Sequence, residues 1–92
     1  MALFLITYDL RKPGRNYESL YELLRDTWEA KPIAESVWLA ELKGPAPTIR
    51  DFIFGEVDAN DRVVVIEITD GADWATGHGM PDGVALLRQY SP

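Results

Sequence analysis

The spacing of apolar residues changes repeatedly along this chain, from the alternation of a strand to the spacing of a helix and back. Residues 2–8 are apolar on both alternating faces, which predicts a central strand. An amphipathic helix is predicted next, from apolar side chains at Tyr17, Leu20, Tyr21, Leu24 and Trp28. Residues 33–42 alternate again, as one bent strand or two short ones. Such an order favours helices packed on a sheet.

The second half of the chain repeats this change of period. Helical spacing returns over residues 49–57, after a break rich in glycine and proline. Residues 62–69 are the strongest strand, because they are rich in β-branched side chains. A short last helix is predicted from Pro81, with loop around it. The fold class is therefore α+β, in one domain over residues 1–92, without repeats or linkers.

Composition excludes several classes of site. The chain has no cysteine, so disulfides, thiolate catalysis and cysteine zinc sites are ruled out. Its one histidine, His78, stands between two glycines and is a poor candidate for a general base. The first apolar run is too short for a signal peptide or a membrane span, so a cytoplasmic protein without a membrane partner is expected.

The first strand ends on a carboxylate, Asp9, and the cations Arg11, Lys12 and Arg15 follow closely. Two interpretations of Asp9 stand. It is a ligand for a hard cation such as magnesium or manganese, which takes one or two protein carboxylates. Alternatively, it is salt-bridged to Arg11 or Arg15, or hydrogen-bonded to the loop backbone, as strand-end and turn aspartates often are. The three cations suit phosphate, but the net charge of -6 argues against broad capture of nucleic acid.

The sheet should carry a second apolar face, away from the helices. Alternation places six residues on it: Leu3, Leu5, Val37, Leu39, Val63 and Val65. An apolar surface of that size is larger than a soluble monomer usually exposes. The sequence therefore predicts that a second copy of the chain covers this face, and that the protein is a homodimer.

The order of these segments resembles the CRISPR-associated Cas-two superfamily over roughly residues 2–69. The likeness is carried by Thr7-Tyr8-Asp9-Leu10 at the end of a strand, by Ser-Val-Trp-Leu-Ala-Glu-Leu at 36–42 and by Asn-Asp-Arg-Val-Val-Val-Ile at 60–66. Small stand-alone SinR-like relatives look closer still, because they share a C-terminal region with a tryptophan, here Trp74. VapD-type toxin ribonucleases belong to the same structural group.

The resemblance implies a ferredoxin-like β-α-β-β-α-β sandwich with a short C-terminal extension or helix, working as a homodimer. Residues 33–42 would then break near Glu35 into two strands. Asp9 matches the strand-end aspartate that, in nuclease members, helps hold a divalent metal at the dimer axis. Arg11, Lys12 and Arg15 would neutralise nearby phosphates, an assignment made by proximity and not by motif.

Two functions follow as expectations. The first is a metal-dependent endonuclease acting on RNA or DNA phosphodiesters, with Asp9 as catalytic metal ligand. The second is a non-catalytic homodimeric interaction or regulatory module of the same fold, linked to a defence or toxin-antitoxin locus. The acidic charge favours the second, since nucleases and DNA adaptors of this type generally present basic residues to their substrate.

Overall fold

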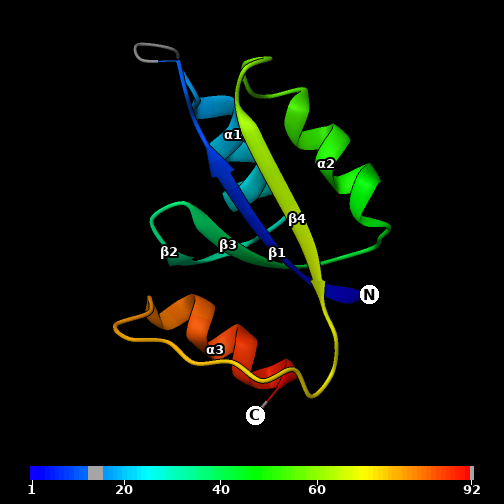
Figure 1. Cartoon of the computed structure of the whole chain (residues 1–92), viewed down its shortest axis with the longest axis vertical. Helices are drawn as coiled ribbons and strands as arrows, with labels where there is room; N and C mark the ends of the chain where they lie inside the picture. Colours follow the sequence, from blue (N-terminus) through cyan, green and yellow to red (C-terminus); the bar gives the residue numbers. More distant parts are fainter. Residues whose placement is uncertain (13–15, 92) are drawn as a thin grey trace.

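The protein is an α+β sandwich with one antiparallel sheet, as the alternating periods predict (Figure 1). The structure, a computed structural model, describes residues 1–12 and 16–91. In chain order the elements are β1 (Ala2–Asp9), α1 (Glu18–Glu22), the π-helical segment η1 (Leu23–Thr27), β2 (Lys31–Ala34), β3 (Val37–Leu42), α2 (Ala46–Phe54), β4 (Arg62–Ile68) and α3 (Pro81–Tyr90). No helix in these ranges is long and apolar enough to cross a membrane.

The strands lie in the order β2-β3-β1-β4, and all neighbouring pairs are antiparallel. β1 is therefore hydrogen-bonded on both sides, which confirms that it is central. The region 33–42 forms two strands that separate at residues 35–36, where the resemblance places a break. The arrangement is compatible with the expected ferredoxin-like sandwich.

The main core lies on the first face of the sheet, which we define by Phe4, Ile6 and Tyr8 of β1. In Figure 1 α1 passes behind the strands and α2 lies beside β4, so this face is covered by both helices. Leu20 of α1 and Ile53 of α2 are fully buried against it. The amphipathic stripe over residues 17–28 thus serves packing.

The second face of the sheet, which carries Leu3, Leu5 and Leu39, is partly covered by α3. Leu3 and Leu39 have no exposed surface, because Leu86 and Leu87 of α3 pack on them. The expectation that a second copy covers the whole face is therefore wrong for these two residues. Helix α3 of the same chain shields Leu3 and Leu39 from water. The apolar pattern of the strands did not reveal that α3 would pack on this face.

Val63 and Val65 were expected on the second face, and this assignment is wrong. In the antiparallel register Val65 lies opposite Ile6 and Val63 opposite Tyr8, so both valines join the first-face core. Directly opposed residues share a face, and a shift of one residue exchanges the faces. Residues 63–66 are all apolar and β-branched, so their pattern does not indicate which alternate residues point to which side.

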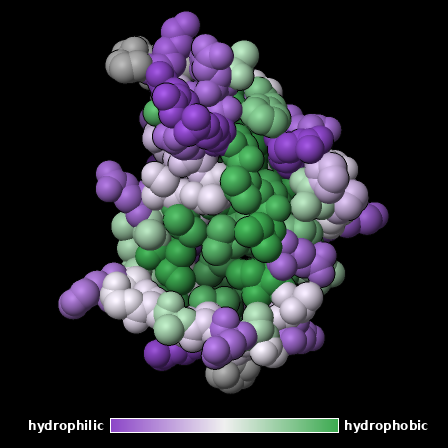
Figure 2. Space-filling model, in the orientation of Figure 1, coloured by the Kyte–Doolittle hydropathy of each residue, from purple (hydrophilic) through white to green (hydrophobic). Residues whose placement is uncertain are grey.

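A stripe of apolar side chains stays exposed on the second face. Val64 lies opposite Thr7 and Ile66 opposite Leu5, and they are 47% and 53% exposed. Figure 2, seen from this side, shows hydrophobic side chains gathered over the middle of the molecule. Beside them a groove of about 370 Å³ runs between the sheet, α3 and the segment 72–76, with Leu5, Ile68 and Trp74 in its wall.

The C-terminal segment is tied to the sheet by polar contacts at its end. The Tyr90 hydroxyl donates to Glu41 Oε2 on β3 at 2.6 Å. Trp74 Nε1 donates to the backbone oxygen of Ser91 at 2.6 Å, and the Ser91 hydroxyl donates to the backbone oxygen of Ala72. These contacts hold α3 and the segment before it in one unit.

Close packing of α3 on β2 makes Gly83 sensitive to substitution. A Cβ at Gly83 would lie 2.6 Å from the Pro32 backbone oxygen and 2.6 Å from Ile33 Cβ, whereas nothing lies within 4 Å of one at Gly77. We expect Gly83→Ala to push α3 away from β2 and to lower the free energy of unfolding by about 1–3 kcal/mol. Urea unfolding measures this loss, with Gly77→Ala as control. Equal midpoints for the two variants would contradict the packing of α3 described above.

Candidate functional site

Asp9 is the last residue of β1 and lies directly opposite Arg62, the first residue of β4. Alternation along β1 puts it on the second face with Leu3, Leu5 and Thr7. Its side chain is 55% exposed. The strand before it is buried, but Asp9 itself reaches water.

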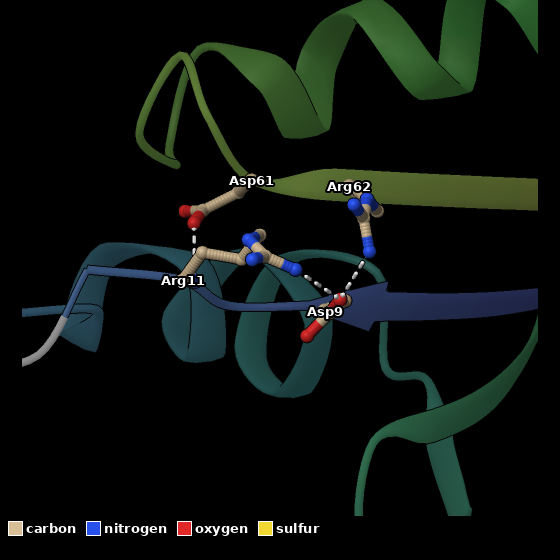
Figure 3. A network of polar contacts seen from close by, with 4 residues as sticks. All are labelled: Asp9, Arg11, Asp61 and Arg62. Atoms are coloured by element: carbon tan, nitrogen blue, oxygen red, sulfur yellow. Dashed lines mark hydrogen bonds and ion pairs between the residues drawn. The ribbon is translucent and has the colours of Figure 1, made fainter.

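Two arginines converge on one oxygen of this carboxylate (Figure 3). Arg11 Nη1 is 3.4 Å and Arg62 Nη1 is 3.2 Å from Asp9 Oδ2. The other oxygen, Oδ1, is turned away from both guanidinium groups. The ion pair with Arg11 agrees with the second interpretation of Asp9, in which a nearby arginine forms a salt bridge with it. Arg62 is a partner that the sequence did not reveal, because only the pairing of β1 with β4 brings these positions together.

A second carboxylate, Asp61, organises the backbone around this site. It is 5% exposed, and it accepts the Arg11 backbone N–H on Oδ1 at 2.6 Å and the Asp58 backbone N–H on Oδ2 at 2.8 Å. Asp61 thereby joins the segment after β1 to the turn before β4. In the sequence, Asp61 stood out only as part of the segment 60–66 that carries the resemblance; an acid directly before the strongest strand was the available signal.

Tyr17 belongs to the same polar cluster. Burial, together with its hydrogen bond to the Asp61 carboxylate, raises the pKa of the Tyr17 hydroxyl. The phenol therefore stays protonated at neutral pH. The surroundings of Asp61 thus include a neutral phenol as well as backbone donors.

The second predicted cation, Lys12, is paired with a residue other than Asp9. Lys12 Nζ lies 3.6 Å from Asp58 Oδ1, in an ion pair with that turn residue. Arg15, the third predicted phosphate-binding residue, lies outside the described residues. The structure thus brings Arg11 to Asp9 and directs Lys12 to Asp58.

A hard metal ion such as magnesium needs oxygen ligands gathered at one place. In the ranges 1–12 and 16–91, no group of three or more His, Asp or Glu side chains is arranged to hold one. Asp58 and Asp61 are engaged by backbone N–H groups or Lys12, which leaves Asp9 as the exposed carboxylate of the cluster. Magnesium often uses only one or two protein carboxylates, so Asp9 suits one ligand position and does not form a complete site by itself.

Asp61 and Asp9 should differ in their effect on stability. Asp61→Ala leaves buried backbone donors without their acceptor, so we expect unfolding free energy to fall by about 1–3 kcal/mol. Asp9→Ala removes only exposed ion pairs, which contribute about 1 kcal/mol or less. Urea unfolding of both variants measures the difference. A larger loss for Asp9→Ala would show that the ion pairs, not Asp61, hold this end of the sheet together.

Comparisons of the chain with models of protein families, with curated proteins and with solved structures returned no match. The likeness to the Cas-two superfamily therefore rests on the order of its short sequence segments. The candidate site rests on the geometry around Asp9 and Asp61.

Proposed function

We propose that this chain is a homodimeric Cas-two-like protein with a ferredoxin-like fold, and that it cleaves RNA or DNA phosphodiesters with a divalent metal held by Asp9. The observation that carries the proposal is the position of Asp9 on the second sheet face, at the end of the exposed apolar stripe. The strand order and the segment order support the fold assignment.

The dimer is argued from what α3 leaves uncovered. Leu5 is partly exposed, and Val64 and Ile66 are about half exposed, side by side on one face. Packing two copies through this stripe removes the apolar side chains from water. Because a two-fold interface uses the same surface of both copies, each copy also brings its own Asp9 to the rim of that interface.

The chemistry follows from two such carboxylates. Asp9 from each subunit would hold a divalent cation such as magnesium or manganese, which would supply the positive charge needed to polarise a phosphodiester and to lower the pKa of a bound water. Asp9 contributes a ligand oxygen through Oδ1, the one turned away from the arginines. Arg11, Lys12 and Arg15 stand near enough in sequence to neutralise substrate phosphates.

A second function is supported by the ion pairs at Asp9. Its Oδ2 is already engaged by Arg11 and Arg62, and the chain carries a net charge of -6. A carboxylate neutralised in this way, in an acidic protein, suits a non-catalytic homodimeric module that acts through protein partners. Metal binding separates the two functions, because only the first requires it.

The dimer interface is tested by a charge placed in the apolar stripe. We expect Ile66→Lys to convert a dimer into a monomer, since it would bury an unpaired ammonium group at the interface. Phe52→Lys is the matched control: Phe52 is 62% exposed but lies on α2, in the layer behind the sheet. Sedimentation velocity at micromolar concentration measures both. A monomeric wild type, or equal dissociation by the two variants, would refute this interface.

The catalytic proposal is tested by metal titration and cleavage on the same samples. We expect calorimetry with magnesium or manganese to give one ion per dimer, and labelled RNA or DNA to be cut only with metal. Asp9→Ala should lose both metal binding and cleavage. Asp51→Ala, which removes an exposed carboxylate on α2, should keep both. Cleavage that survives in Asp9→Ala would exclude Asp9 from the chemistry, and the absence of metal binding would favour the non-catalytic module.

A further inference from the structure

Arg62 reaches the candidate site from the start of β4, whereas Arg11 follows the end of β1. The two Nη1 atoms contact the same Asp9 oxygen, at 3.2 Å and 3.4 Å, although Arg62 is 53 residues away from Asp9. Both side chains are well exposed, at 69% for Arg62 and 48% for Arg11. Two guanidinium groups that share one acceptor oxygen leave most of their N–H donors for other ligands.

The backbone, and not the ion pairs, sets where these arginines stand. Arg62 is fixed as the first residue of β4 by its register with Asp9. The main chain of Arg11 is fixed by its hydrogen bond to the buried Asp61. If the Asp9 contacts are lost, both guanidinium groups therefore stay at the same end of the sheet. Lys12, the next residue, is 62% exposed, but its Nζ is paired with Asp58 Oδ1 at 3.6 Å.

We infer that Arg62 and Arg11 form a binding site for the phosphate backbone of a single-stranded nucleic acid, with Asp9 as its counter-ion in the free protein. The planar guanidinium fork matches phosphate geometry, and exposed pairs with a carboxylate are weak enough for phosphate to replace. Two exposed guanidinium groups, rather than one enclosed cradle, suit successive phosphates of a polyanion. The inference deepens the proposed function by adding Arg62 as a substrate-binding residue and giving Asp9 a second role.

This assignment predicts opposite effects for two charge-removing substitutions. Without metal, Asp9→Asn removes the competing carboxylate, so oligonucleotide affinity should rise about two- to fivefold. Arg62→Gln removes a phosphate contact, so affinity should fall by a similar factor of about two to five. The dependence of log affinity on log salt should also become shallower by about 0.7 in Arg62→Gln, the loss of one phosphate contact to a single strand.

The experiment is fluorescence anisotropy of a labelled single-stranded RNA, and of the DNA of the same sequence, in EDTA at several salt concentrations. The matched controls are Asp51→Asn and Arg50→Gln on α2. These residues also form an exposed ion pair, with Arg50 Nη2 3.0 Å from Asp51 Oδ1, so the controls remove the same charges away from the site. Circular dichroism and urea unfolding confirm that each variant is folded. Inorganic phosphate is added as competitor at constant ionic strength.

Opposite shifts for Asp9→Asn and Arg62→Gln, with unchanged controls, support the inference. It is overturned if the wild type binds neither oligonucleotide at up to about 1 mM protein, or if the α2 variants shift affinity as much as the site variants. It is also overturned if free phosphate displaces the oligonucleotide completely, because the site would then take a small anion. A magnesium arm keeps the two proposals apart: opposite shifts in EDTA without cleavage in magnesium would refute the nuclease and leave the phosphate site standing.

Discussion

The structure depends on shielding β1 from water on both sides. This strand is hydrogen-bonded to β3 and to β4, and its residues Leu3, Phe4 and Ile6 are completely or almost completely buried although they point to opposite faces. One layer of helices cannot cover both faces of a sheet. The chain uses α1 and α2 on the first face and α3 on part of the second. What α3 leaves open, around Val64 and Ile66, is the physical basis of the dimer proposal.

The polar end of the sheet is built around a buried carboxylate and not around the exposed one. Asp61 ties the segment after β1 to the turn before β4, whereas Asp9 makes only exposed ion pairs. A buried acceptor for backbone N–H groups is expensive to remove, and exposed pairs are easily exchanged for other ligands. Stability therefore depends on Asp61, whereas Asp9 is the aspartate proposed as a ligand, and we expect substitution of Asp9 to leave the fold intact.

The candidate site was only partly predictable. Asp9 and Arg11 are close in sequence, at the end of a strand, so their ion pair could be anticipated. Arg62 could not, because its approach to Asp9 needs the last strand to lie beside the first. Asp61 stood out only as part of the segment 60–66. Its role as a buried acceptor depends on a backbone donor from Arg11, 50 residues earlier, which sequence alone does not place beside it.

The sequence by itself determined which segments become strands and helices, since the spacing of apolar residues is a local property that each segment carries alone. It also indicated a helix starting at Pro81, whereas the break near Glu35 was implied only by the family resemblance. Only the tertiary structure decided which side of β4 faces the core, where α3 docks and which arginines meet Asp9. These outcomes depend on strand order and register, and a run such as residues 63–66, apolar at every position, is compatible with either face until the neighbouring strand selects one.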